Sequence, residues 1–225
     1  MKYVFVDFEM SKIGKAFPEQ RKVWSMEIVE IGAVMLDESF VEISSFKRYV
    51  KPEYARHINT AIYNLTGIDD YFLSGCKGIE EELEAFAKWC LSEGEDVIVY
   101  AWSESDLNQI LKEYELKNLT PGEALEKVIR VWKDLQLEYD EAVGNTRPTA
   151  LHRALASIGS DFDGKMHDAL DDARNTSKLF IEMSDPEEFQ KTVKASHEYK
   201  DENATVTLGD IFDFSKFRFD EDASA

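Results

Sequence analysis

The stretch KYVFVDFEM, residues 2–10, decides the fold, because β-branched and aromatic residues run in it directly up to two acids. A run of this composition predicts a β-strand. Apolar side chains lie on both of its faces, at Val4, Phe5, Val6 and Phe8. This predicts a central strand that is covered on both sides. Asp7 and Glu9 are two residues apart, so their side chains point to the same face.

Two carboxylates side by side on a strand predict a metal site. They repel each other, and one would be protonated unless a cation lay between them. Mg²⁺ and Mn²⁺ prefer oxygen ligands, so a hard divalent cation suits Asp7 and Glu9. The alternative for this pair alone is the solvent face of an edge strand, which the apolar neighbours on both faces disfavour.

Two further strands are expected at residues 27–36 (EIVEIGAVML) and 43–50 (ISSFKRYV), with a hairpin turn at 37–39. Gly32 marks a bulge or the close approach of another backbone. The rest of the chain alternates helices and strands. Five helices are expected: at 79–91, at a start capped by Ser103 or Ser105, at 148–159, at 168–183 with Asp168 as N-cap, and from Asp185-Pro186 onward. Strands are expected at 97–102 and near 129–132, the latter within the ambiguous run 128–135.

This order of elements predicts an α/β fold, with a sheet of mixed direction and helices on both faces. We expect one domain at residues 1–184, followed at 185–225 by a C-terminal helix and an acidic, Phe-containing tail.

The composition is that of a globular protein, with 225 residues of which 44% are hydrophobic. No apolar run approaches the roughly 20 residues of a membrane span, and the apolar start of the chain is too short for a signal peptide. We therefore expect no membrane partner. Cys76 and Cys90 form no CxxC pair, which predicts reduced thiols and a cytoplasmic location.

Three further residues could join the two acids. Asp106 lies just past strand 97–102, and open α/β sheets place ligands at the carboxyl ends of their strands. A lone Asp there is nevertheless more typical of the first turn of a helix, and Glu104 competes for the same role. His167 precedes a helix and Asp172 lies one turn inside it. A neutral imidazole is a suitable general base near pH 7, although a lone His at a helix start is ordinarily a cap or a surface residue.

Taken together, these stretches resemble the DEDDh branch of the DEDD 3′→5′ exonucleases. VFVDFEM resembles the first motif of that branch, and EIVEIGAVML resembles the strand after it. YVKPEYARHINTAIYNLTGID, residues 49–69, resembles the segment that leads into a Leu-Thr-Gly-Ile turn. YAWSESDLNQIL resembles the second motif and HDALDDARNTSKLF the third, so the resemblance covers residues 2–183.

The resemblance implies a ribonuclease-H-like fold with a mixed five-stranded sheet. It also implies hydrolysis of phosphodiester bonds at the 3′ end of a single-stranded nucleic acid, with two divalent cations, Mg²⁺ or Mn²⁺, as cofactors. Asp7, Glu9 and Asp172 would hold the cation that carries the attacking water. Asp7 would bridge to the second cation, which Asp106 supports. His167 would take the proton from the nucleophile.

Within the branch, the chain most resembles the exonucleases that trim structured RNA 3′ ends and small interfering RNAs, together with their bacterial relatives. RNA is therefore favoured over DNA as the substrate. In the second motif Ser103 and Glu104 stand where a small residue, often Gly, is common, which concerns the fit of the substrate. One alternative is a catalytically silent nucleic-acid-binding or scaffold module on the same fold, which the loss of a metal ligand would indicate. The other is a two-metal endonuclease, against which the spacing of His167 and Asp172 argues.

The formal net charge of −19 opposes a polyanionic partner, which normally meets a basic surface. A basic and aromatic segment at residues 11–25 offsets it locally. Phosphate contacts and base stacking on aromatic rings hold single strands without sequence readout. The residues expected to bind the substrate are Met10, Lys12, Lys15, Arg21, Lys22 and Trp24. The alternative for the segment is a solvated loop that is basic by composition, and for Met10 it is packing at the end of a strand.

Overall fold

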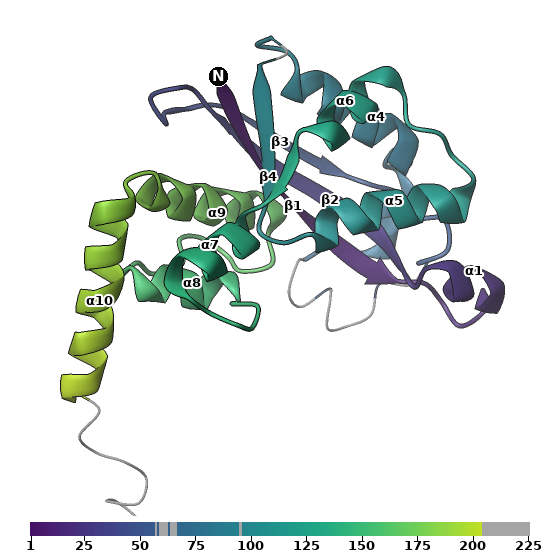
Figure 1. Ribbon diagram of the computed structural model, residues 1–225. Helices are drawn as coiled ribbons and strands as arrows, with labels where there is room; N and C mark the ends of the chain where they lie inside the picture. The colour runs from purple at the N-terminus through teal and green to yellow at the C-terminus, as the bar shows by residue number, and fades with distance from the viewer. Residues whose placement is uncertain (57, 59–62, 64–66, 95, 204–225) are drawn as a thin grey trace, which may run out of the picture.

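The computed structural model describes residues 1–56, 58, 63, 67–94 and 96–203 (Figure 1). A sheet with the strand order β3-β2-β1-β4-β5 lies at its centre. The strands are β1 (Lys2–Lys12), β2 (Met26–Leu36), β3 (Glu42–Tyr49), β4 (Val97–Ala101) and β5 (Trp132–Asp134). β1 pairs antiparallel with β2 and parallel with β4. The sheet is therefore mixed with β1 in its middle, which confirms the predicted architecture.

Helices cover both faces of the sheet (Figure 1). One face carries α4 (Ile79–Cys90), α5 (Ser105–Lys117) and α6 (Glu123–Arg130). The other face carries α9 (Ala169–Met183), with α7 (Leu135–Val143) and α8 (Leu151–Ser157) beside it. The remaining helices are α1 (Pro18–Val23), α3 (Asp70–Ser74) and α10 (Pro186–Asn203). α10 packs on α8 and α9 through Phe189 and Val193.

The alternation of side chains along β1 divides the core in two. Val4, Val6 and Phe8 pack into the cluster that includes α4, α5 and α6. Phe5, on the other face, packs against Phe180 of α9 with 5.1 Å between the ring centroids. Burying a large apolar side chain contributes about 1.5–3 kcal/mol, so this pattern fixes which way the strand faces. Asp7 and Glu9 consequently lie on the α9 face.

The run 128–135 folds differently from the expectation. Val128 and Ile129 belong to α6, and β5 begins only at Trp132, so a strand starting at residue 129 is wrong. Leu125 and Val128 are both fully buried three residues apart, which is a helical spacing. β5 forms because Trp132 and the two residues after it pair with β4. That pairing is a tertiary contact, which the local pattern does not record.

Two helix starts also differ from the expectation. α5 has Glu104 at its N-cap position rather than Ser103 or Ser105. α8 begins at Leu151 rather than at Pro148, and its N-cap residue is Ala150. The reason lies in Thr149, whose backbone N–H donates to the Asp140 carboxylate at 3.2 Å and whose hydroxyl donates to it as well. These bonds hold the backbone of residue 149 outside the helix.

The basic segment at residues 11–25 is more ordered than a loop. Ser11 and Lys12 extend β1, and Pro18–Val23 form α1. The predicted cap at Asp168 is confirmed, because its side chain accepts hydrogen bonds from the N–H groups of Leu170 and Asp171. The hairpin between β2 and β3 is confirmed by the antiparallel pairing of the two strands.

Among the described residues, no helix combines the length and the apolar character needed to cross a membrane. Cys76 and Cys90 are free thiols. The tail at residues 204–225 lies outside the described residues, as do His57 and residues 59–62 and 64–66, which include the first two residues of the Leu-Thr-Gly-Ile turn. The domain boundary after residue 184 stays a prediction.

Candidate active site

The two acids of β1 lie where this strand runs past its parallel neighbour. Asp7 pairs with Gly32 of β2, and Glu9 pairs with Glu30. β4 ends opposite Val6. From Asp7 onward, the edge of β1 that faces β4 is therefore unpaired with β4. The carboxyl end of β4 lies beside the two acids.

Asp106, in the first turn of α5, occupies the edge that β4 leaves. Its Oδ1 accepts a hydrogen bond from the backbone N–H of Phe8 at 3.1 Å. The side chain is buried, with 4% of Asp106 exposed. Because Phe8 stands between Asp7 and Glu9 in the strand, this bond holds the Asp106 carboxylate next to both. The structure thus brings Asp106 to the acids of the first motif.

The start of α9 rests directly on β2. A Cβ atom at position 32 would collide with the backbone of Ala169 and Leu170, so the approach requires the glycine found there. Gly32 therefore marks a close approach of another backbone, and the irregularity in the β1–β2 pairing lies elsewhere, between Glu9 and Met10. The same turn of α9 carries Asp172 over the β1 acids.

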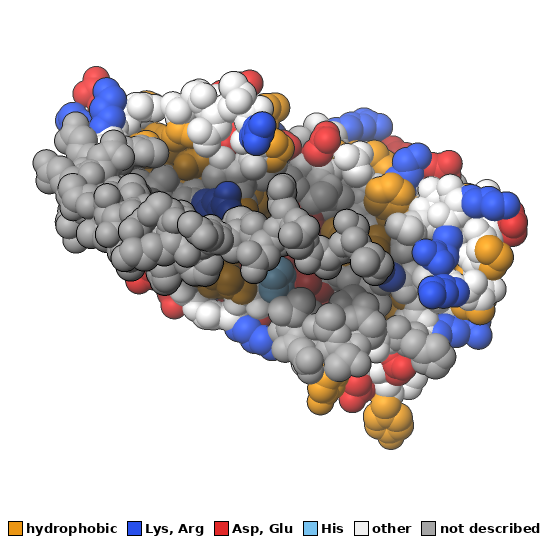
Figure 2. Space-filling model, turned by 90° about the horizontal axis from the view of Figure 1, so that it is seen from below, with side chains coloured by type: hydrophobic (Ala, Val, Ile, Leu, Met, Phe, Trp, Pro, Cys, Tyr) orange, Lys and Arg blue, Asp and Glu red, His pale blue; other side chains and the backbone are white. Residues whose placement is uncertain are grey.

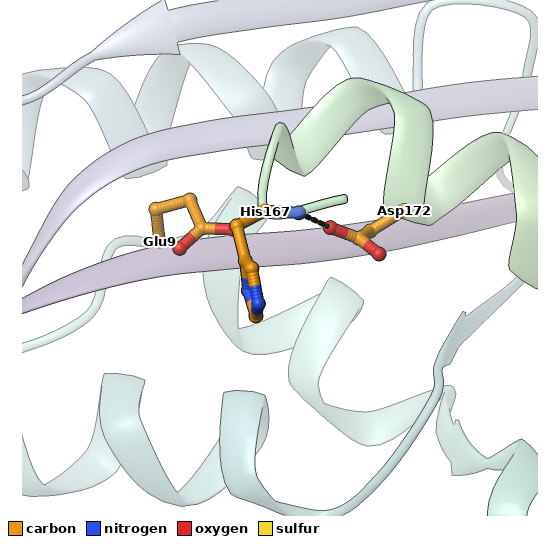
Figure 3. Close-up of side chains that lie close together, drawn as sticks. All are labelled: Glu9, His167 and Asp172. Atoms are coloured by element: carbon orange, nitrogen blue, oxygen red, sulfur yellow. Dashed lines mark hydrogen bonds between the residues drawn. The ribbon is translucent and has the colours of Figure 1, made fainter. Parts of the chain in front are cut away.

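His167 lies between Glu9 and Asp172 (Figure 3). Its φ angle of 64° is in the left-handed region, which residues with a Cβ rarely adopt. This conformation lets its backbone N–H donate to Asp172 Oδ2 at 2.8 Å. Glu9, His167 and Asp172 each offer one side-chain donor atom, and these atoms lie within 4.8 Å of one another. The entry loop and the helix therefore present both residues to one point.

The carboxylates share a strongly negative region, in which Asp106 is buried and Asp7, Glu9 and Asp172 are half-buried. Burial, followed by the charge of Asp172, raises the pKa of Glu9 to about 8. Burial, followed by the charge of Asp106, raises the pKa of Asp7 well above its usual range. Burial also raises the pKa of Asp106 to about 7 and that of Asp172 to about 6, although backbone N–H donors oppose both shifts. All four groups can be ionised together at neutral pH only if a cation compensates them.

This donor set fits a hard divalent cation. Carboxylate oxygens are the ligands that Mg²⁺ and Mn²⁺ prefer, and the raised pKa values are those of acids that lack a counter-charge. The residues that could hold the metal are Asp7, Glu9, Asp106 and Asp172. Their roles as ligands, and that of His167 as a base, stay predictions.

Sequence reasoning missed a second group of charges beside the acids. Glu30, the cross-strand partner of Glu9, is 1% exposed. Lys47 of β3 lies with its Nζ 2.9 Å from Glu30 Oε1 and 2.6 Å from Asp168 Oδ2. A charged residue inside the apolar run EIVEIGAVML was the available signal for Glu30. Lys47 lies in the mixed run ISSFKRYV, where a solvated lysine is equally expected.

The basic residues expected to bind the substrate lie at the end of β1 and around α1. Those that are exposed to solvent are Lys12, Lys15, Arg21 and Lys22. Lys22 forms an ion pair with Glu19 at 2.8 Å, which reduces the positive charge that it offers to a phosphate. Figure 2 shows Lys and Arg side chains gathered at the end of the molecule that carries α1 in Figure 1.

The other two substrate-binding candidates are held by the protein itself. The indole N–H of Trp24 donates to Gln109 Oε1 of α5 at 2.6 Å, so this ring is fixed rather than free to turn. Met10 is half-buried and packs against the main core cluster. Both are therefore less exposed than the basic side chains of the segment, and their contacts with a nucleotide stay predictions.

Comparison with known proteins agrees with this geometry. A family model described as "RNase_T: Exonuclease" matches residues 4–180. The chain is 29% identical to ERI1 exoribonuclease 2 of Xenopus laevis over 203 residues, which is 80% of this chain and 28% of that protein. It is 25% identical to the probable 3′-5′ exonuclease KapD of Bacillus subtilis over 215 residues, which is 95% of this chain and 94% of that protein.

Solved structures share the fold. The nuclease domain of 3′hExo, described as a DEDDh family member bound to rAMP, superposes with a TM-score of 0.68 at 22% identity, covering 81% of this chain and 90% of the other. The chain spans less than a third of the length of the ERI1 exoribonuclease 2 proteins. Because the family model covers the first, second and third motifs alike, the chain belongs to the RNase_T exonuclease family.

Proposed function

We propose that this chain is a 3′→5′ exonuclease that hydrolyses phosphodiester bonds at the 3′ end of single-stranded RNA. One observation carries the proposal. Asp7 and Glu9 of β1, Asp106 of α5 and the His167–Asp172 pair at α9 come from three distant segments and meet at one edge of the sheet. A silent binding module would not need to retain every one of these groups.

Two divalent cations, Mg²⁺ or Mn²⁺, are the proposed cofactors. Asp7, Glu9 and Asp172 would hold one, while Asp7 and Asp106 would hold the other. Such ions supply a water nucleophile at neutral pH and neutralise the phosphate. Two divalent ions also balance the charge of the four carboxylates, so an acidic protein can receive a polyanion at this point.

His167 is the proposed general base. Its backbone N–H is bound to Asp172, so the position of the residue is fixed while its imidazole stays exposed. An exposed imidazole beside Glu9 can accept the proton of the attacking water and release it to solvent. Exposure also leaves room for the terminal nucleotide, which a buried imidazole would not.

The substrate strand is proposed to run from these acids toward α1. Phe17, beside α1, stacks edge-on with Tyr54, with 5.3 Å between the ring centroids, and Arg56 lies 5.2 Å from the Phe17 ring. This aromatic and basic surface lies beside the exposed Lys and Arg side chains of the segment 11–25. Relatives of the chain carry the name exoribonuclease, which favours RNA. A cytoplasmic location stays a prediction.

The test uses one single-stranded RNA labelled at its 3′ end or its 5′ end, with Mg²⁺ or Mn²⁺. The expected result is release of the 3′ label as mononucleotide and progressive shortening of the 5′-labelled strand. Asp7→Asn should abolish both, and His167→Asn should slow both by about 100-fold or more. Internal cuts, or full activity of Asp7→Asn, would overturn the proposal. A matched DNA strand measured beside the RNA tests the choice of substrate.

A further inference from the structure

The ammonium group of Lys47 joins two carboxylates that belong to different elements. Lys47 lies on β3 and is 28% exposed at its side chain. It contacts Glu30 on β2 at 2.9 Å and Asp168 at 2.6 Å. It also lies 5.8 Å from the centre of the Tyr49 ring on its own strand. A lysine held by two acids and an aromatic ring has little freedom to leave.

Both partners of Lys47 are direct neighbours of active-site residues. Glu30 is the residue directly across from Glu9 in the β1–β2 pairing. Asp168 follows His167 in sequence and is the N-cap of α9, where its other oxygen accepts from the N–H of Leu170 at 3.2 Å. The ion pairs therefore connect β2 and β3, at the point where β2 pairs with Glu9 of β1, to the turn that bears His167 and begins the helix of Asp172.

We propose that Lys47 is a positioning residue for the exonuclease reaction, because it holds the start of α9 against Glu30 and so fixes His167 and Asp172 over Glu9. Gly32 allows α9 to approach the sheet, but an absent side chain supplies no attraction. Lys47 supplies it. Paired with Lys47, Glu30 is also kept from competing with Glu9 for a cation, since its Oε1 already faces an ammonium group. This inference rests on the proposed function.

Charge compensation alone is the competing role, and one double variant separates it from positioning. Lys47→Met combined with Glu30→Gln removes one positive and one negative charge, so the net charge beside the site is unchanged while the link is lost. The double variant also leaves no fully buried carboxylate without its partner, which Lys47→Met alone does. Asp168 loses Lys47 as well, but its side chain is 24% exposed and keeps the hydrogen bonds from the N–H groups of Leu170 and Asp171. Lys47→Arg keeps the charge and the reach toward both acids.

The control is a second ion pair between the same two elements. Arg174 of α9 contacts Glu42 of β3 at 3.1 Å, and both side chains are more exposed than Lys47. Arg174→Gln removes an α9–β3 contact, together with a longer contact to Asp171 at 3.9 Å, and leaves the contacts among Lys47, Glu30 and Asp168 in place. It therefore reports what the loss of such a link costs away from the site.

The measurements are kcat and KM on single-stranded RNA, Mn²⁺ affinity by calorimetry, and Tm. The double variant is expected to lose roughly 10-fold in kcat and roughly 10-fold in Mn²⁺ affinity, as supporting residues of metal sites do, with KM little changed. Lys47→Arg should recover most of both, and Arg174→Gln should match the wild type. Wild-type kcat and Mn²⁺ affinity in the double variant, or an equal loss in Arg174→Gln, would overturn the inference.

The metal titration keeps this test separate from that of the function. If the wild-type protein cleaves no nucleic acid, the proposed activity fails. The Mn²⁺ affinities of the wild type and the double variant still decide whether Lys47 positions the metal-binding residues.

Discussion

The backbone N–H of Phe8 donates a hydrogen bond to the carboxylate of Asp106, 98 residues further along the chain, at 3.1 Å. This bond replaces the one that β4 would make if it continued beside β1. Asp106 thus has two tasks at once. One oxygen completes the hydrogen bonding of the central strand, and the charge of the carboxylate lies close enough to Asp7 and Glu9 to help burial raise the pKa of both.

The two tasks of Asp106 can be separated by substitution. Asp106→Asn keeps an acceptor for Phe8 N–H but removes the charge, so Tm should be unchanged or slightly higher while kcat falls roughly 100-fold or more, beyond the loss caused by a supporting residue. Asp106→Ala leaves the Phe8 N–H without a partner and should also lose about 1–3 kcal/mol of stability. Thermal melts and turnover of both variants test this. Equal stability of the two would contradict the structural task.

His167 has an unfavourable backbone conformation, so its loss should cost activity and not stability. Asn tolerates the left-handed region better than His does. His167→Asn is therefore expected to keep or raise Tm, because the N–H bond to Asp172 is made by the backbone. Removing the general base should lower kcat by about 10²–10⁴-fold. A variant that melts early would show instead that the imidazole packs into the fold.

Gly32→Ala should displace α9. The added methyl group meets the backbone of Ala169 and Leu170, which has no side-chain freedom to yield. Overpacking of this kind costs about 3 kcal/mol or more, and activity should fall with it, since α9 carries Asp172. Gly75→Ala is the matched control, because its nearest neighbour atom is 3.7 Å away. Comparable melting of the two variants would refute the close approach as the reason for Gly32.

The raised pKa values predict how metal and pH act together on stability. A carboxyl whose pKa is raised by folding stabilises the metal-free protein below its unfolded pKa, and this contribution is lost as pH rises through the folded value. For Glu9 the window runs from the usual 4.5 to about 8. With chelator, the contribution of these acids to Tm should therefore fall across this window.

Added Mg²⁺ or Mn²⁺ should reverse that loss, by about 2.7 kcal/mol when the metal is at 100 times its Kd. The gain in Tm on adding metal should grow from about pH 5.5 to pH 8, because fewer protons must then be displaced. Differential scanning calorimetry with chelator and with metal measures it. A gain that is the same at both pH values would mean that the acids of the site are not the metal ligands.

The basic segment is expected to act on binding and not on chemistry. Neutralising Lys12, Lys15 and Arg21 to Gln should raise KM about 10-fold with kcat nearly unchanged, and the salt dependence of log KM should weaken by about 0.7 per lost phosphate contact. The control neutralises Lys88, Lys127 and Arg130 on α4 and α6, which lie on the opposite face of the sheet from α9. An equal rise of KM in the control would point to overall charge rather than to this segment.

The parts of the site that can be predicted from the sequence are those in which the spacing of residues alone determines where their side chains point. Asp7 and Glu9 share a face because successive side chains of a strand point to opposite faces. The N-cap residue Asp168 predicts the start of the helix that carries Asp172. Asp106 could not be placed in this way, because it is held by the backbone N–H of Phe8. Phe8 lies on β1, whereas Asp106 follows β4, which is distant in sequence and pairs parallel with β1. Only the resemblance to known motifs selected it.

Lys47 and β5 show the limit of local reasoning more clearly. Nothing in the run ISSFKRYV distinguishes Lys47 from its solvated neighbour Arg48, because the acids that hold Lys47 come from β2 and from the start of α9. Similarly, β5 is a strand only because β4 lies beside it. Each depends on a long-range contact, and single-residue preferences do not encode such contacts.

The close approach of α9 to Gly32 has a consequence for the time at which the enzyme becomes active. Synthesis proceeds from the N-terminus, so Asp7, Glu9 and Asp106 have emerged long before His167 and Asp172 can dock. Contacts across such separations also form slowly, because a long loop must be closed first. On the proposed function, a nascent chain therefore carries an incomplete and inactive nuclease. It cannot cut the RNA from which it is being translated until α9 has been made and has docked.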